Sequence, residues 1–395
     1  MPTSPVRNYR VTNEKKEVSN GTSPQAKAYQ RLKNRLFIIN LLLSLTVLLI
    51  IILSGFSARL KINLSGFSQN PPLLNGLYII AVSLIFYILG FPLEFYEGFT
   101  LEHRFKLSNQ NLPGYLKDNF KKALISLTIA VIAIESLYWF LGQFPEIWWI
   151  LCACGWFFLT VLLAKITPGI LIPLFYKYLP LKDAGLRDKI KEMFLKTNVG
   201  LKDVSMIDFS SKTRKLNAAV VGFGNGRRVI LADNLLEELS HDEILSIIAH
   251  ELGHYKHKDT IKIIGFSAII TAILFYLGGI ILKNSFMFFG YTSIADIAGF
   301  PLFALIMLIL GHIVLPLQNG FIRHLETQAD MYCVSLTRAP GVFISMMEKL
   351  SRKNLADAQP GKFVEIMLYD HPPIAKRIRL AEEFRQKLNE TKYAF

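Results

Sequence analysis

Two histidines and a glutamate stand at a spacing that suits metal chemistry, in His250-Glu251-Leu252-Gly253-His254. On a helix, residues four apart project from one face, so His250 and His254 can bind a single metal ion. Imidazole nitrogens are common ligands of tetrahedral Zn²⁺, at about 2.0–2.1 Å. Glu251 follows the first histidine, beside the position where a zinc-bound water of lowered pKa would attack a carbonyl, so it is the candidate general base. The motif predicts zinc-dependent peptide hydrolysis.

A catalytic zinc ion usually has three protein ligands and one open site. The third candidate is Glu326, which lies 72 residues after His254. Two apolar segments fill this interval, and we expect them to form a membrane hairpin that returns Glu326 to the level of His250. Asp330, one helical turn after Glu326, is placed to accept the spare ring N–H of a ligand histidine. Without the upstream motif, a solvated acidic helix face would be the better interpretation of these two residues.

Three further residues are candidates for contacts with substrate. A peptidase needs a donor to the carbonyl oxygen that becomes negative in the transition state, and His371 or Arg377 could serve. Asn217 begins a predicted strand, and an exposed strand edge can hold an extended peptide by main-chain pairing. The alternative for Asn217 is an ordinary strand. The other histidines lack ligand spacing, and among them His312 stands out because it lies within an apolar segment.

The elements around the motif follow from local patterns. Ser240 stands three residues before Glu243, which is a capping box that starts the helix carrying His250. Upstream, residues 183–198 have the apolar spacing of an amphipathic helix. Three short strands are predicted, the last two joined as a hairpin by the turn Gly224-Asn225-Gly226. These strands are Val204–Phe209, Ala218–Phe223 and Arg228–Ala232.

The composition indicates a mainly α integral membrane protein. Apolar residues make up 52% of the 395 residues and charged residues only 19%, which is unusual for a soluble protein. Six apolar segments are long enough to cross a bilayer, which takes about 20 residues each. The net charge of +14 does not indicate a nucleic-acid partner, because the basic residues lie between apolar spans. The predicted spans are 36–56, 73–93, 123–141, 146–166, 261–282 and 300–317, the fourth continuing through kinks at Pro168 and Pro173.

The distribution of Lys and Arg predicts the topology. The N-terminal segment holds eight, and fifteen lie between Lys165 and Thr260, whereas the Gly142–Pro145 loop holds none. This asymmetry places both termini and the zinc helix on the cytoplasmic side of a plasma (inner) or endoplasmic reticulum membrane. We expect five regions: a disordered tail (1–35), a four-span region (36–182), a soluble α+β region with the zinc helix (183–260), a membrane hairpin (261–317) and a helical region with the third ligand (318–395).

Several separate motifs together resemble the type I CAAX prenyl proteases, a family of integral-membrane zinc metallopeptidases within a wider group that includes HtpX. The resemblance covers about residues 73–382. It includes the zinc motif, Glu326 with Asp330, and His371-Pro372 followed by Arg377. It also includes Glu102-His103-Arg104-Phe105, Ile172-Pro173-Leu174-Phe175-Tyr176-Lys177, Asn217-Ala218 with Gly222, and Arg228-Val229-Ile230-Leu231 with Asp233.

The resemblance implies a fold and a set of roles. His250, His254 and Glu326 would be zinc ligands, Glu251 the general base, and Asp330 the carboxylate behind a ligand. Asn217 would mark a substrate-binding edge strand, and His371 and Arg377 would contact substrate or transition state. Six or seven transmembrane helices would form a chamber, with a small α+β metallopeptidase domain at the cytoplasmic face; full-length eukaryotic relatives have seven spans, and this chain has six predicted spans.

Three functions remain open from the sequence. The first is an endopeptidase that removes the C-terminal tripeptide of prenylated CAAX peptides or cleaves other membrane-associated peptides. The second is a protease for membrane-protein quality control. The third, from another class, is a metal transporter, and Glu251 argues against it because a site that only binds metal needs no base.

Overall fold

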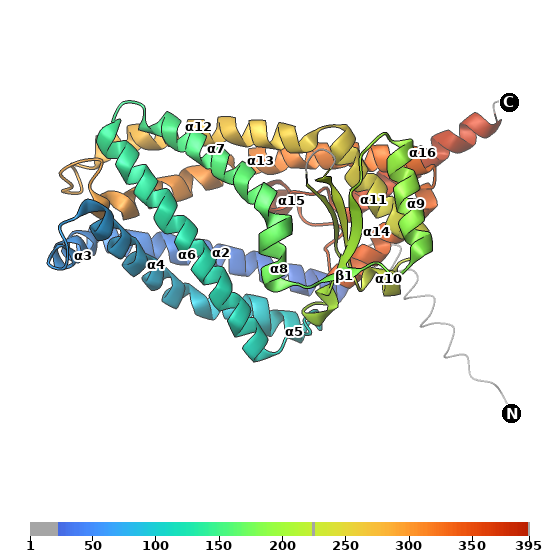
Figure 1. The fold of residues 1–395 in the computed structure, drawn as a ribbon, viewed down its shortest axis with the longest axis horizontal. Helices are drawn as coiled ribbons and strands as arrows, with labels where there is room; N and C mark the ends of the chain where they lie inside the picture. Colours follow the sequence, from blue (N-terminus) through green and yellow to red (C-terminus); the bar gives the residue numbers. More distant parts are fainter. Residues whose placement is uncertain (1–22, 223–225, 394–395) are drawn as a thin grey trace.

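The computed structural model describes residues 23–222 and 226–393. Figure 1 shows an elongated molecule. Long helices occupy most of its length, and a small sheet with shorter helices lies at the end where the described chain finishes. The molecule therefore divides into a membrane part and an α+β lobe.

Six helical segments in the described part of the chain are long and apolar enough to span a bilayer, as predicted. Their apolar surfaces are largely exposed, which is what lipid-facing helices require because the bilayer itself solvates them. They are Pro24–Leu53 (α2), Pro71–Arg104 (α4, η1 and α5), Leu112–Gln143 (α6), Trp148–Phe175 (α7, η2 and α8), Asp259–Ser285 (α12) and Ile297–Thr337 (η5 and α13).

The first membrane helix begins earlier than expected. Helix α2 starts at Pro24, where Ser23 caps it by accepting a hydrogen bond from the Ala26 main-chain N–H at 3.0 Å. Tyr29 is fully buried. The predicted disordered tail of residues 1–35 is therefore wrong for residues 24–35, and its first part, residues 1–22, lies outside the described residues.

Two spans are interrupted by short π-helical turns. Helix α4 (Pro71–Phe95) runs into η1 (Tyr96–Leu101) and α5 (Glu102–Arg104). Helix α7 (Trp148–Ile166) passes through η2 (Thr167–Leu171), which contains Pro168, into α8 (Ile172–Phe175). Proline lacks a donor and clashes with the preceding turn, so the helix widens and bends there. The predicted continuation of the fourth span through this proline is confirmed.

The lobe is built on a four-stranded sheet with the order β1-β2-β4-β3. Strand β2 (Asp203–Ile207) pairs in parallel with β4 (Arg228–Ala232), whereas β3 (Ala218–Val221) pairs with β4 in antiparallel fashion. The predicted hairpin pairing is therefore present, although most of its turn lies outside the described residues. Strand β1 (Tyr178–Pro180), which was not predicted, pairs antiparallel with β2.

Helices surround this sheet and share one apolar core with it. This core contains β4, α9 and the inner face of the motif helix, together with residues from α13, α14 and α16. The helices of the lobe are α9 (Ala184–Lys196), α10 (Leu235–Glu238), α11 (His241–Lys256), α14 (Pro340–Asn354), α15 (Lys362–Leu368) and α16 (Ile374–Tyr393). A short helix, η3 (Phe209–Ser211), precedes β3. Helix α3 (Phe56–Ser65) lies at the opposite end of the molecule (Figure 1).

The segment after α5 connects the membrane part to the lobe. The Leu107 carbonyl accepts a hydrogen bond from the Arg214 main-chain N–H at 2.9 Å, and Ser108 forms an isolated bridge with Thr213. Glu102 pairs with Lys215 at 2.8 Å. These contacts lie just before β3, so they tie this strand to the membrane helices.

Candidate active site

The helix that carries the motif is well defined at its start. In α11, the Ser240 hydroxyl accepts from the Glu243 N–H while the Glu243 carboxylate accepts from the Ser240 N–H, which is the predicted capping box. The same carboxylate also binds Ser345 and Lys349 of α14 at 2.7 Å. The cap therefore fixes both the start of α11 and its position against α14.

Helix α13 (Phe300–Thr337) is one continuous helix that leaves the membrane and packs against α11. Gly253 lies at their contact, where a Cβ atom would come within 2.9 Å of the Ala329 Cα. Real Cβ atoms do not approach so closely, so glycine at this position lets the two backbones touch. The Cys333 thiol adds a hydrogen bond to the Ser246 carbonyl at 3.1 Å. The membrane hairpin thus returns α13 to α11, as predicted.

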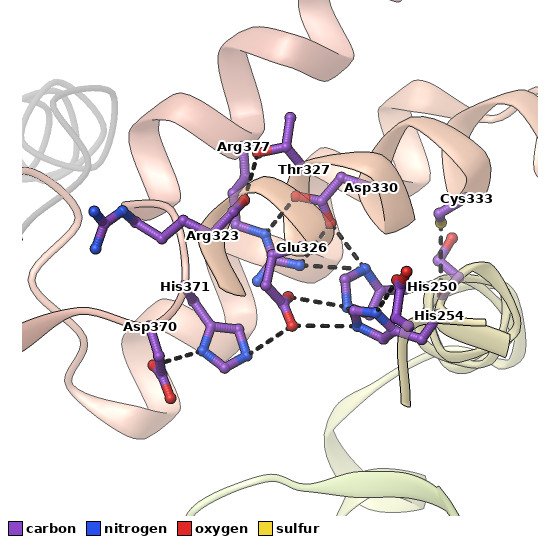
Figure 2. Close-up of polar contacts among 12 residues, drawn as sticks. His250, His254, Arg323, Glu326, Thr327, Asp330, Cys333, Asp370, His371 and Arg377 are labelled. Carbon is purple, nitrogen blue, oxygen red and sulfur yellow. Dashed lines mark hydrogen bonds and ion pairs between the residues drawn. The ribbon is translucent and has the colours of Figure 1, made fainter. Parts of the chain in front are cut away.

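Three side chains converge between these helices (Figure 2). His250 Nε2 lies 3.3 Å from one carboxylate oxygen of Glu326, and His254 Nε2 lies 3.2 Å from the other. The two Nε2 atoms are themselves 3.2 Å apart. His250 and Glu326 are buried, and His254 is partly buried. These three residues form a group whose ligand atoms could together hold one metal ion.

The outward ring nitrogens of both histidines face carboxylates. His250 Nδ1 lies 2.9 Å from Asp330, and His254 Nδ1 lies 3.0 Å from Asp259. Each carboxylate can accept a hydrogen bond from the Nδ1–H of its histidine. In the neutral imidazole, the lone pair of Nε2 is then available to a metal ion. Asp330 was predicted for this position, whereas Asp259 was missed. Both carboxylates are almost fully buried.

Asp330 is held in turn by Arg377 of α16. The guanidinium binds both carboxylate oxygens, Nε at 2.7 Å and Nη2 at 2.6 Å, and Nη2 also lies 3.4 Å from His250 Nδ1. Arg377 is only 8% exposed. The structure thus differs from the predicted substrate contact at this residue, because the guanidinium lies behind the histidine and its fork is occupied by Asp330.

The carboxylates around His250 change its protonation. Burial alone lowers the pKa of the imidazole, but hydrogen bonds to Asp330 and Glu326 outweigh burial and raise this pKa from its ordinary 6.5 to about 9. An imidazolium cannot bind a metal ion, so metal binding at neutral pH must release this proton.

Glu251 follows His250 in α11, and His371 lies beside Glu326. Glu251 is half-buried, and its carboxylate has no hydrogen bond or ion pair with any residue in the described ranges. His371 is 53% exposed at its side chain; its Nε2 lies 3.4 Å from Glu326 and its Nδ1 lies 2.8 Å from Asp370. His371 is thus in contact with a candidate ligand, and Glu251 is next to another in the chain with its carboxylate unpaired in the described ranges.

The loop that carries His371 is fastened to α13 by residues that the sequence patterns did not reveal. Asn319 donates to the Met367 carbonyl at 2.8 Å, and Arg323 donates to the carbonyls of Glu365 at 2.9 Å and Tyr369 at 2.5 Å. The same helix face therefore holds both Glu326 and the segment before His371. No spacing rule marks Asn319 or Arg323, because their partners are main-chain groups over forty residues away.

Strand β3 lies at one edge of the described sheet, the position suggested for the strand after Asn217, and β1 lies at the other edge. It packs against α11, the helix that carries both histidines. Asn217 is exposed immediately before the strand, and its carbonyl accepts from the Ala232 N–H at 3.0 Å. The outer edge of β3 therefore offers main-chain groups close to the metal-ligand helix.

His312 has an ordinary explanation. Its Nδ1 lies 2.8 Å from the Leu308 carbonyl one turn earlier in α13, which satisfies that nitrogen within the helix. Its ring also lies beside Phe37. Nothing in these contacts connects this histidine to the site.

Comparisons with known proteins agree with this arrangement. Residues 180–385, which contain strands β2, β3 and β4 and all the residues of the site, match the model of peptidase family M48. The chain belongs to peptidase family M48. Residues 7–177 match a second model, described as the CAAX prenyl protease N-terminal region with five membrane helices. The chain is thus a multi-pass membrane metalloprotease of the CAAX prenyl protease family, and the family implies a metal ion at the site.

Individual M48 relatives cover most of the chain. The metalloprotease YhfN of Bacillus subtilis is 28% identical over 91% of this chain and 85% of its own length. CAAX prenyl protease 1 of Saccharomyces cerevisiae is 27% identical over 76% of this chain and 70% of its own. Among solved structures, Ste24p of S. mikatae has the same fold, with a TM-score of 0.81 at 23% identity, covering 90% of this chain and 88% of that one.

We expect Asp259→Asn to weaken metal binding by this M48 protein by about 10–100-fold, the usual cost of losing a carboxylate behind a ligand histidine. Asparagine keeps the size of the side chain but removes the charge that orients and polarises His254. The measurement is metal affinity by competition with a chelator.

Lys256→Gln is the control, because Lys256 is exposed on the same helix α11 and is paired with neither His254 nor Asp259. The control should bind metal nearly as well as the unaltered protein. Equal losses in the two variants would contradict a role of Asp259 through His254.

Proposed function

We propose that this protein is a zinc endopeptidase whose metal ligands are His250, His254 and Glu326. The observation that carries the proposal is the convergence of their ligand atoms: the two Nε2 atoms lie 3.2 Å apart, and each faces a different carboxylate oxygen of Glu326, at 3.3 Å from His250 and 3.2 Å from His254. Bonds of about 2.0–2.1 Å to a tetrahedral ion require ligand atoms about 3.3–3.4 Å apart. The separation of the two imidazole nitrogens fits this geometry, and the carboxylate between them can supply the third ligand oxygen, which leaves the fourth position open.

The chemistry of the donors also fits zinc. Two imidazoles and one carboxylate form the ligand set of several zinc peptidases. Both imidazoles direct Nε2 to the common point because their Nδ1 atoms face Asp330 and Asp259. When bound, the ion would supply Lewis-acid activation of a water molecule and of the scissile carbonyl.

Glu251 is the general base in this proposal. Its carboxylate has no partner in the described part of the chain and adjoins His250, so it can accept a proton from the attacking water and pass it to the leaving amine. His371, with Nε2 toward the site and Nδ1 held by Asp370, donates to the carbonyl oxygen as charge develops there. Arg377 acts by holding Asp330 and so positions His250.

We further propose that the substrate pairs with the outer edge of β3, next to Asn217. Main-chain pairing fixes an extended peptide without reading every side chain. Because β3 packs on α11, a peptide added there would pass close to Glu251 and the ligands. The membrane spans on either side favour a substrate that is itself tethered to the bilayer.

The substrate that we propose is a CAAX-type peptide with a prenylated cysteine, from which the C-terminal tripeptide is removed. The name of the yeast relative supports this class. By the charge distribution of the loops, we place the site at the cytosolic side of a plasma (inner) or endoplasmic reticulum membrane.

The deciding experiment is mass spectrometry of the products formed by purified, zinc-loaded protein from matched peptides with and without a farnesyl group. Release of an intact tripeptide from the farnesylated peptide alone would support the proposal. Cleavage of both peptides at several bonds, together with cleavage of unfolded membrane proteins, would favour a quality-control protease instead. Zinc flux into vesicles without cleavage would favour a transporter.

A further inference from the structure

An apolar groove lies between α6 and α7, away from the candidate ligands. It has a volume of about 810 Å³ and is lined almost entirely by apolar side chains, including those along α6 between Leu124 and Phe140. The polar groups Thr128 and Ser136 donate their hydroxyls to carbonyls of their own helix at 2.9 and 2.8 Å. The groove therefore offers an occupant only apolar contacts, as a hydrocarbon chain requires.

A basic pocket lies one helical turn away from the groove along α6, on the side of the lobe. Lys121 lies one helical turn before Leu124 and Ile125, which line the groove, and Lys121 itself lines the pocket. Its Nζ donates to the Leu174 carbonyl at 2.7 Å, which closes the gap between α6 and α8. The basic pocket has a volume of about 400 Å³ and thus follows the groove along the same face of α6.

The charge of this pocket is positive. Four lysines and two aspartates line it. Asp118 pairs with Lys212 and lies 3.9 Å from Lys121, so it is already compensated. Lys117 and Lys177 are exposed, and in the described part of the chain neither forms an ion pair. Two cations are therefore free to meet an anion at the end of an apolar groove.

The depth of these groups matches a lipid bilayer. From Lys121 to the end of α6 at Gln143 the helix rises about 33 Å, close to the hydrocarbon thickness of about 30 Å. The groove then lies at the depth of acyl chains and the lysines at the depth of phosphates. Anionic lipids are concentrated in the leaflet that faces positively charged protein segments.

We propose that this groove and the basic pocket together bind one anionic glycerophospholipid, with an acyl chain between α6 and α7 and its phosphate at Lys117 and Lys177. The phosphate charge of the lipid distinguishes it from the prenyl chain of a substrate. The prenyl chain is attached to the cysteine through an uncharged thioether, so lysines at this position would not stabilise its binding. The site is separate from the candidate zinc ligands, so its occupancy does not depend on peptide hydrolysis.

The test is native mass spectrometry of the purified full-length protein in detergent, titrated with dioleoyl phosphatidylglycerol or with dioleoyl phosphatidylcholine. We expect one phosphatidylglycerol to remain bound per chain at concentrations where phosphatidylcholine is lost. The double variant Lys117→Gln/Lys177→Gln should weaken phosphatidylglycerol binding about tenfold or more. Lys191→Gln/Lys202→Gln is the control, because it removes the same charge from an exposed region of the lobe.

A second pair of variants tests the groove itself. Gly155 lines it, and a Cβ there would meet nothing within 4 Å, so Gly155→Phe should fill the groove and displace the lipid. Gly265→Phe is the control, since Gly265 has equally open space but does not line the groove. Glycerol 3-phosphate, which has the phosphate without chains, should not compete at similar concentrations.

Several results would overturn the lipid site. If the protein retained the two lipids equally, the proposed selectivity for an anionic headgroup would be wrong. If the lysine and glycine variants bound lipid as their controls do, the proposed location of the site would be wrong. Full competition by glycerol 3-phosphate would reduce the site to a phosphate pocket. Displacement by S-farnesyl cysteine methyl ester, together with no effect of the lysine variant, would make the groove a prenyl site instead.

Discussion

Replacing Glu251 by glutamine is expected to reduce peptide hydrolysis by about 10³-fold or more while leaving zinc in place, because a positioned general base contributes about 10²–10⁴-fold and glutamine cannot accept the proton. Glutamine has nearly the same shape as glutamate. Since the Glu251 carboxylate bonds no residue of the described chain, its loss should not disturb the packing of α11. The measurements are cleavage rate on a farnesylated peptide and zinc content by elemental analysis.

Asp242→Asn is the matched control for this prediction. Asp242 lies on the same helix, is 71% exposed at its side chain and has only a 3.8 Å pair with Lys189. It should keep nearly full activity. Retained cleavage in Glu251→Gln would exclude Glu251 as the base, and loss of zinc in that variant would show that the glutamate acts on the metal site rather than on the proton.

The features that sequence patterns predicted are those controlled by local spacing. The pair His250 and His254 lies on one face of a helix wherever that helix sits, and the capping box at Ser240 marks its start regardless of tertiary contacts. The six spans were predictable because a bilayer demands length and apolar composition, and these can be counted. Glu326 could be placed because the two spans before it must return the chain to the same side.

The features that were missed depend on conformation or on distant partners. Asp259 reaches His254 because Lys258 adopts φ 57°, a left-handed conformation that ends α11 and starts α12 at a new angle. A lysine seldom marks such a turn, so no pattern indicated it. The start of α2 was placed too late because residues 24–35 are polar, yet Tyr29 is buried against the rest of the protein.

The role of Arg377 also depends on a distant partner, which the sequence pattern did not reveal. A basic residue six positions after His371 suggested a contact with substrate, since arginine binds carboxylates and peptide carbonyls well. The guanidinium instead faces into the protein, where α16 packs on α13 and both oxygens of Asp330 meet its fork. Spacing from His371 says nothing about this, because the partner belongs to another helix.

Removing the charge of Arg377 is expected to lower both the stability of the protein and its affinity for zinc. Arg377→Gln would leave the Asp330 carboxylate buried and without the guanidinium that binds both of its oxygens. Breaking one half of a buried pair costs about 3–5 kcal/mol, because the remaining charge stays desolvated. The free energy of unfolding should fall by that amount, and zinc affinity should fall as well, since Asp330 orients His250. Thermal unfolding of the zinc-free protein and chelator competition measure the two effects.

The double variant Arg377→Gln/Asp330→Asn separates stability from metal binding. With both charges gone, the asparagine carbonyl can still accept from His250 Nδ1, so most of the lost stability should return. Zinc affinity should stay about tenfold or more below that of the unaltered protein, because a neutral acceptor polarises the imidazole less. Arg379→Gln, on the exposed face of the same helix, is the control and should change neither quantity. A double variant as unstable as the single one would mean that Arg377 supports the fold through contacts other than Asp330, and the positioning of His250 would then need another source.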